Sequence, residues 1–326
     1  MNRDDNWKNW IPLYLKGGCI EWGYMGRERF VEPFCQETLQ KLAAKPFNQL
    51  FRRQSNLAAL LELSISDNAL PLSGIVFHMS RCGSTLVAQA LAALPNSVVL
   101  SEPEPFDKLL QWLIASQIPN EAALLRGLIC AMGQPRRTED RLLFLKTDCW
   151  HICHIDRILS AFPGVPWLFL YRDPIEVLVS QQRRPASYLI PGALARHGLY
   201  PPVDLISQPL EHSAWVLKRV LRDAAEAMMR HPGGILLNYH ELPLALETRL
   251  AEHFSLNLGN IEIAGLRQAG TLDTKNPYRL FQPDSEDKHA DADADLHAMA
   301  THWLGEAYAE LERMRSTNNC NVQVGG

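Results

Sequence analysis

Short apolar runs alternate with longer amphipathic segments along most of the chain. The runs are bounded by turn residues and rich in β-forming side chains, which is typical of strands buried in a parallel sheet. Between them, segments such as residues 86–94 and 211–229 repeat apolar side chains at helical spacing. This alternation predicts an α/β fold, a three-layer sandwich with helices on both faces of a central parallel sheet. The expected strands are Gly74–Met79, Ser97–Leu100, Leu142–Leu145, Trp167–Tyr171 and Gly234–Asn238.

The pattern changes toward both ends of the chain. Apolar side chains around Phe47, Leu50, Leu57 and Leu60 recur at helical spacing, so we expect residues 1–70 to form a mostly helical N-terminal segment. Residues 71–315 then form the α/β domain, and residues 316–326 a polar tail. Two stretches, 184–208 and 269–295, are rich in turn formers or polar residues, and we expect irregular lid segments there.

Composition narrows the class of protein. The 326 residues include 32 Lys and Arg against 36 Asp and Glu, a net charge of −4, with 47% hydrophobic residues. These values are typical of a globular protein and argue against intrinsic disorder and a broad nucleic-acid-binding surface. We see neither a signal peptide nor a membrane span. Seven irregularly spaced cysteines do not form a disulfide framework, which favours a reducing cytoplasm.

The first motif is Ser80-Arg81-Cys82-Gly83-Ser84-Thr85, between an expected strand and an expected helix. The first turn of a helix presents unpaired backbone N–H groups and the positive end of the helix dipole, and Gly83 lets the backbone approach an anion closely. Ser84 and Thr85 add hydroxyl donors, and Arg81 adds a permanent charge. The segment therefore predicts a P-loop-like phosphate-binding loop; the alternative is an ordinary turn with a capped helix.

A second motif follows the strand Trp167–Tyr171. Arg172 stands at the carboxyl end of that strand, Asp173 is the expected N-cap of the next helix, and Pro174 is its first residue. Ligands of open α/β sheets bind at the carboxyl ends of the strands. Arg172 and Ser180, eight residues later, are thus candidates for a second phosphate site; otherwise Arg172 pairs with a carboxylate and Ser180 is buried.

Together the motifs resemble those of sulfotransferases that use 3'-phosphoadenosine 5'-phosphosulfate (PAPS). In that family a loop of the type P-[RK]-S-G-T-T binds the 5'-phosphosulfate, and R-[DN]-P with a later Ser binds the 3'-phosphate. Residues 236–242, LLNYHEL, look like the family's late strand ending in Y-E-D-L. The resemblance covers roughly residues 73–255. Ser80 replaces the family's Pro and Cys82 its first Ser, whereas the matching positions are Arg81, Gly83, Ser84, Thr85, Arg172, Asp173, Pro174 and Ser180.

The resemblance implies sulfuryl transfer from PAPS, with PAP as product and no metal, to a hydroxyl or amine of a small-molecule, sugar or carrier-borne acceptor. The net charge of −4 argues against a nucleic-acid partner, and the oligomeric state stays open. For the family's basic nucleotide-covering loop, Lys275, Tyr278 and Arg279 are the available residues. The expected cofactor-binding residues are Arg81, Cys82, Gly83, Ser84, Thr85, Arg172 and Ser180.

The resemblance also points to catalytic groups. Lys146 ends an expected strand where cytosolic members carry Lys-Thr-His, and Asp148 stands in the place of that His. Other branches use a Glu after the second strand, where this chain has Glu102, followed closely by Glu104. A base must reach the acceptor hydroxyl, and a raised pKa helps it. We expect Lys146 to contact the donor and Glu102 to be the base, with Asp148 as the alternative and His151 or Glu104 as further candidates.

Two alternatives to sulfuryl transfer stay open at this point. An ATP-using kinase or NTPase would require GxxxxGK[ST], but the chain has His78 and Ser84 where that pattern needs Gly and Lys. A non-catalytic nucleotide-binding protein would retain the same fold. The Cys and His residues of segment 149–154 invite a zinc site, but their spacing is not that of a zinc motif, so we expect no metal there.

Overall fold

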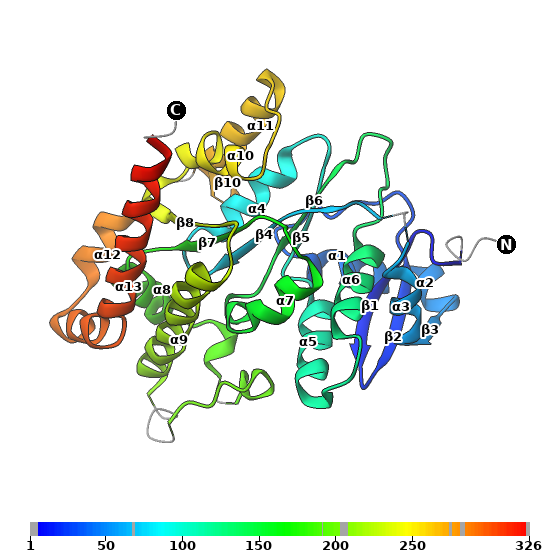
Figure 1. Cartoon of the computed structure of the whole chain (residues 1–326), viewed down its shortest axis with the longest axis horizontal. Helices are drawn as coiled ribbons and strands as arrows, with labels where there is room; N and C mark the ends of the chain where they lie inside the picture. Colours follow the sequence, from blue (N-terminus) through cyan, green and yellow to red (C-terminus); the bar gives the residue numbers. More distant parts are fainter. Residues whose placement is uncertain are drawn as a thin grey trace.

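The structure, a computed structural model, describes residues 6–66, 69–190, 192–202, 208–273, 276–280 and 284–323. Its centre is a five-stranded sheet in which each neighbouring pair is parallel (Figure 1). The five predicted strands are confirmed, with ends that differ by at most two residues. In spatial order they are β5 (Ser97–Ser101), β6 (Leu142–Lys146), β4 (Leu72–His78), β7 (Trp167–Tyr171) and β8 (Gly234–Asn238).

Helices cover both faces of this sheet, which confirms the predicted α/β class. Figure 1 shows α4, α10 and α11 on one side and α5, α7 and α9 on the other. Every residue of β5 and β7 is buried, as expected for strands that are apolar on both faces. The helices of the α/β part are α4 (Ser84–Ala93), α5 (Glu104–Ser116), α6 (Glu121–Met132), α7 (Ile155–Ala161), α8 (Pro174–Arg183), α9 (Pro209–Arg230), α10 (Arg249–His253) and α11 (Asn260–Thr271).

The expectation of a mostly helical N-terminal segment is wrong for its first part. β1 (Trp10–Lys16), β2 (Cys19–Tyr24) and β3 (Arg53–Asn56) form an antiparallel sheet, accompanied by α1 (Cys35–Ala43), α2 (Pro46–Leu50) and α3 (Ala58–Leu63). From Leu13 on, buried and exposed residues alternate along β1, which is the period of a strand. Gly17 and Gly18 both have positive φ, as a two-residue hairpin turn requires.

The N-terminal sheet is anchored to the α/β core. Figure 1 shows it beyond α5 and α6, on the β5 side of the molecule. Gln134, which follows α6, donates its side-chain amide to the carbonyls of Trp7 and Trp10, both at 3.1 Å. Helix α3 lies so close to α6 that a Cβ on Gly127 would meet the Leu60 carbonyl oxygen at 1.9 Å. Residues 6–66 therefore pack as a wall on one end of the central sheet.

The C-terminal part is more regular than the sequence suggests. Within the stretch expected to be irregular lie β9 (Leu272–Asp273), β10 (Asn276–Leu280) and α12 (Ser285–Asp291), and α13 (Ala294–Gln323) continues through most of the expected polar tail. Helix α13 packs on α8, α9 and β8, and its buried side chains include Leu296, Leu304 and Leu311. In the described part of the chain no helix has both the length and the apolar character needed to cross a membrane.

Candidate functional site

Two loops follow the neighbouring central strands β4 and β7, whose connections lead to opposite edges of the sheet. The connection after β4 leads toward β5 on one side, and the connection after β7 leads toward β8 on the other. Such a switch point leaves a crevice at the carboxyl ends of the two strands, and ligands of open α/β sheets bind there. The loop of residues 79–83 follows β4, and Arg172 follows β7. Both predicted anion sites therefore lie at the position that the fold favours for a ligand.

The loop after β4 has an unusual backbone. Ser80, Arg81 and Gly83 have φ values of 73°, 52° and 84°. Two of these residues carry side chains that disfavour positive φ, and such strain concentrates at binding sites. Gly83 is the residue before α4, where a Cβ would lie 2.9 Å from the ring of Tyr239. The loop thus wraps tightly around the start of α4, whose free N–H groups suit an anion.

His78, the last residue of β4, holds this loop through a hydrogen bond. The backbone N–H of Ser80 donates to His78 Nδ1 at 3.1 Å, so the ring carries its proton on Nε2. That nitrogen lies 2.9 Å from the Thr147 carbonyl oxygen and 3.3 Å from Glu102 Oε1. Burial and the charge of Lys146 lower the pKa of His78, which keeps the imidazole neutral. Sequence reasoning noted His78 only as a missing glycine, although it connects the loop to Glu102.

The side chains of Arg81 and Cys82, both in this loop, point in different directions. The Arg81 guanidinium donates to the Arg184 carbonyl at 2.7 Å, so it lies over the end of α8. The Cys82 thiol is buried and donates to the Leu170 carbonyl at 3.2 Å. Any contact between Cys82 and an anion in the loop would therefore come from its backbone rather than from its sulfur.

We expect Cys82 to be unreactive in the folded protein. Burial raises the pKa of its thiol to about 11, although nearby backbone N–H groups and the charges of Lys146 and Arg172 lower it. At pH 8 only about one thiol in a thousand would then be thiolate, the reactive form. N-ethylmaleimide at pH 8, followed by peptide mass spectrometry, should label exposed Cys19 well before Cys82. Equal labelling of the two residues without denaturant would contradict this burial.

Arg172 is buried at the end of β7 and surrounded by acceptors. Its guanidinium contacts the Glu176 carboxylate and donates to Asp284 Oδ1 at 2.5 Å. Its Cζ lies 3.7 Å from the centre of the Tyr239 ring, so the guanidinium stacks on the ring face. Ser180, one turn further along α8 than Glu176, donates to the Glu176 carbonyl at 2.8 Å. The same Tyr239 ring borders Gly83, and it thereby joins the two loops.

The helix after Arg172 begins as predicted. Asp173 is the N-cap of α8 and its Oδ1 accepts from the backbone N–H of Ile175 at 2.8 Å, with Pro174 in the first turn. Helix α12 packs against α8 and brings a second cation to the site. Lys288 is buried, and its Nζ lies 2.8 Å from Asp284 Oδ2. Lys288 had no sequence signal, because only the docking of α12 places it beside Arg172.

Lys146 and Glu102 form an ion pair at the carboxyl ends of β6 and β5. Lys146 Nζ contacts Glu102 Oε1 and lies 5.2 Å from the centre of the Phe34 ring. Lys146 is buried, whereas the Glu102 side chain is 23% exposed. Burial by itself would raise the pKa of Glu102, but Lys146 and His78 outweigh it and lower this pKa to about 2. Glu102 is therefore ionised while this pair exists.

Asp148 has the opposite electrostatic environment. Burial and repulsion by Glu102 and Asp107 raise its pKa well above 3.8. Its backbone N–H donates to His151 Nδ1 at 3.2 Å at the start of the 3₁₀ helix η2 (Cys149–His154). Two carboxyl groups whose pKa values are pushed apart, Glu102 and Asp148, are thus close enough to influence each other. This divergence is typical of acid–base sites.

A buried cluster around Asp107 fixes the segment that follows α8. Asp107 Oδ1 accepts from Trp150 Nε1 at 3.1 Å, and it lies 3.0 Å from His151 Nε2 and 2.9 Å from His197 Nε2. His197 belongs to the 3₁₀ helix η4 (Ala195–His197) in the predicted lid segment. Although burial opposes ionisation, His151 and His197 lower the pKa of Asp107. The cluster therefore holds residues 195–197 against α5.

The side chains of Asp107, His151 and His197 are close enough to raise the question of a metal ion, because their ligand atoms lie within 4.8 Å of one another. The hydrogen bonding argues against one. Since the Asp148 N–H donates to Nδ1 of His151, Nε2 carries the ring proton and donates to Asp107. A metal ion needs a lone pair on the nitrogen that binds it. In this arrangement His151 therefore has no lone pair on Nε2 to offer a metal ion.

The structure thus brings most of the predicted residues to one edge of the sheet. Arg81, Ser84 and Thr85 line one loop, Arg172 and Ser180 the other, and Lys146, Glu102 and Asp148 lie beside them at neighbouring strand ends. Of the residues available for a covering loop, Lys275 and the side chains of Tyr278 and Arg279 lie outside the described residues. Sequence reasoning missed Asp107, His197, Asp284 and Lys288.

Comparisons with known proteins complete the description of the site. No family model matches the chain, and no curated protein matches it. Solved structures of sulfotransferases do match. Sulfotransferase STF9 from Mycobacterium avium is 15% identical, with 83% of this chain and 85% of that chain covered and a TM-score of 0.45. The sulfotransferase domain from the curacin biosynthetic pathway is 14% identical, with 77% and 98% covered and a TM-score of 0.42.

Proposed function

We propose that the protein transfers a sulfuryl group from PAPS to a hydroxyl or amine of an organic acceptor. The observation that carries this proposal is the meeting of two anion sites at one switch point. The strained loop at the start of α4 and the buried Arg172 both contact the Tyr239 ring. A donor with anionic groups at both ends of one nucleotide matches two such sites better than a ligand with a single phosphate chain.

The residues present suit such a donor. The amides of residues 82–85 and the Ser84 and Thr85 hydroxyls would hold its 5'-phosphosulfate, and Arg172 with Ser180 its 3'-phosphate. Arg172 and Lys288 already share one carboxylate, that of Asp284, so this place accommodates anionic oxygens. In the bound state we expect the 3'-phosphate to take over the contacts that Asp284 makes with these two cations.

The chemistry that the donor supplies is an activated sulfuryl group, with PAP as its leaving group. Lys146 is placed to stabilise the negative charge that moves onto the leaving phosphate oxygen, because it projects from the neighbouring strand end. We propose Glu102 as the base. When Lys146 turns from Glu102 toward the donor, Glu102 loses the main interaction that lowers its pKa, while its burial remains. Its affinity for the acceptor proton then rises at the moment when both substrates are present.

A thermal-shift comparison of PAPS, PAP and ATP tests this proposal. A ligand at one hundred times its Kd stabilises a folded protein by about 2.7 kcal/mol, which corresponds to a rise in Tm of roughly 4 °C at this size. We expect PAP and PAPS to give such a rise at concentrations where ATP gives little. Stabilisation by ATP without stabilisation by PAP would contradict the proposed function and favour an ATP-using enzyme.

Replacing Glu102 by Gln should lower sulfuryl transfer by about 100-fold or more, the scale of general base catalysis. Transfer would be measured with ³⁵S-labelled PAPS and a panel of phenols and alcohols, and the PAP-induced rise in Tm should persist. Glu226→Gln, on the exposed face of α9, is the matched control and should retain activity. If Asp148→Asn abolishes transfer and Glu102→Gln does not, the base is Asp148 instead.

The ion pair of Glu102 with Lys146 should also affect how the stability of the free protein depends on pH in the acid range. The folded-state pKa is lowered from 4.5 to about 2, so the ionised carboxylate contributes stability above pH 4.5. That contribution is lost as the pH falls from 4.5 toward 2. The stability difference between wild type and Glu102→Gln should therefore shrink over this interval.

A further inference from the structure

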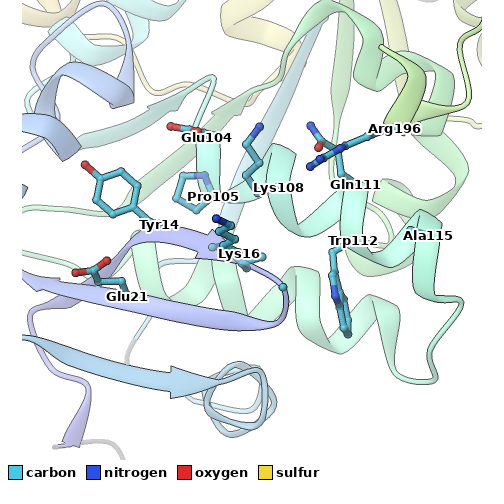
Figure 2. A pocket seen from close by; sticks show the side chains of 12 residues that line it. Tyr14, Lys16, Glu21, Glu104, Pro105, Lys108, Gln111, Trp112, Ala115 and Arg196 are labelled. Atoms are coloured by element: carbon cyan, nitrogen blue, oxygen red, sulfur yellow. The ribbon is translucent and has the colours of Figure 1, made fainter. Parts of the chain in front are cut away.

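A cavity of about 740 Å³ lies between the N-terminal hairpin and helix α5 (Figure 2). Cavities of this size take ligands comparable to a drug molecule. Its wall comes from the turn of β1 and β2, from α5 and from the segment of Arg196. Glu104 and Pro105, in its lining, start α5 directly after Glu102 and Pro103. The cavity therefore reaches the start of α5, two residues after the proposed base in the chain.

The lining of this cavity combines apolar surface with separated charges. Tyr14 and Trp112 provide aromatic surface. Figure 2 shows Glu104 toward the side of Tyr14, Arg196 toward the opposite side, and Lys108 between them. A ligand that fits this wall has a flat apolar body, and its anionic end lies near Lys108 and Arg196.

The buried Asp107 cluster holds these two cations near each other. Lys108 follows Asp107 on α5, and Arg196 precedes His197 in η4, so the 2.9 Å contact of Asp107 with His197 brings both to the cavity. Arg196 makes no ion pair with any carboxylate of the described residues, and Lys108 lies 3.7 Å from Asp107 Oδ2. Arg196 thus presents a forked donor set that is free to bind a carboxylate in a bidentate manner.

We propose that this cavity binds the acceptor and that the acceptor is an aromatic hydroxy acid, whose carboxylate contacts Arg196 and Lys108. The ring packs against the apolar surface near Tyr14 and Pro105, and the hydroxyl end points toward Glu104 and the neighbouring Glu102. The role as acceptor site rests on the proposed sulfuryl transfer. The binding of an aromatic acid is argued from the residues that line the cavity and does not depend on sulfuryl transfer.

The test uses matched pairs of probes with the full-length protein. Isothermal titration calorimetry compares a series of phenolic carboxylic acids, from 4-hydroxybenzoate to 4-hydroxycinnamate, with the corresponding neutral amides. We expect at least one acid to bind about tenfold or more tightly than its amide. Arg196→Ala and Lys108→Gln should each remove most of this preference, and Arg222→Ala, an exposed arginine on α9, should leave it unchanged.

The outcomes separate this inference from the proposed function. If PAP stabilises the protein but no acid of the series binds, or acids and amides bind equally, the inference is wrong and sulfuryl transfer stands. If an acid binds with the expected dependence on Arg196 while PAP does not bind, the cavity assignment holds and the acceptor role is lost. The comparison of acid with amide needs no variant, so poor folding of Arg196→Ala cannot obscure the result.

Discussion

Replacing Arg172 by methionine is expected to abolish the stabilisation by PAP and to lower the Tm of the free protein. The substitution removes the cation that faces Glu176 and Asp284 and leaves the buried Glu176 carboxylate without its main partner. Removal of one member of a buried pair costs about 3–5 kcal/mol, or roughly 4–7 °C in Tm at this chain length. Differential scanning fluorimetry with and without PAP measures both effects.

A second variant separates ligand binding from folding. In Arg172→Met/Glu176→Gln the unpaired buried charge is neutralised, and Asp284, whose side chain is 42% exposed, is solvated. The free double variant should regain most of the lost Tm, yet it should still fail to respond to PAP. Arg219→Met is the matched control, because Arg219 also pairs with a carboxylate four residues along its helix. A normal PAP response in the double variant would show that Arg172 does not bind the nucleotide.

The second large effect is expected for Asp107→Asn. The asparagine places an amide N–H₂ group among the N–H groups of Trp150, His151 and Gln111, which now donate to the carboxylate. We expect a loss of about 3–5 kcal/mol in the free energy of unfolding. The segment around His197 should also open, so that trypsin cleaves at Arg196 under conditions in which the wild type is intact.

The stability difference between Asp107→Asn and wild type should depend on pH. The partners of Asp107 hold its pKa below the ordinary 3.8, so the carboxylate contributes stability above that pH and loses it as the pH falls further. The deficit of Asp107→Asn relative to wild type should therefore be full at neutral pH and shrink in acid. Asp156→Asn is the control, since Asp156 is 56% exposed and its pairs should be worth about 1 kcal/mol or less. Equal stability of Asp107→Asn and wild type at pH 7 would contradict the role assigned to the cluster.

The core of the fold could be predicted because its signals are local. Each strand of the central sheet is a short apolar run that is buried on both faces, and Asp173-Pro174 marks the start of α8 by capping chemistry alone. The N-terminal hairpin also had a local signal. Gly17-Gly18 with alternating side chains around it predicts a two-residue turn, and this signal was outweighed by the apolar spacing further along, where Phe47 and Leu50 are in fact exposed.

The rest of the site depends on contacts that no local pattern contains. Asp284 and Lys288 reach Arg172 only because α12 docks on α8, more than a hundred residues from it in sequence. His197 lies in a segment that the sequence predicts to be irregular. Only its contact with Asp107, ninety residues earlier, identifies it as part of the cluster. Arg172 itself was predictable from its place at a strand end, but its buried ion pairs were not.

The most direct test of two anion sites for one nucleotide is the affinity for PAP compared with that for 5'-AMP, measured by isothermal titration calorimetry at one salt concentration. The two ligands differ only in the 3'-phosphate, which should contact Arg172, Ser180 and Lys288. Charge-assisted hydrogen bonds of this kind are worth about 1.5–3 kcal/mol each, so PAP should bind at least about 100-fold more tightly. Equal affinities for PAP and 5'-AMP would contradict the proposed role of the second anion site and with it the assignment of PAPS as donor.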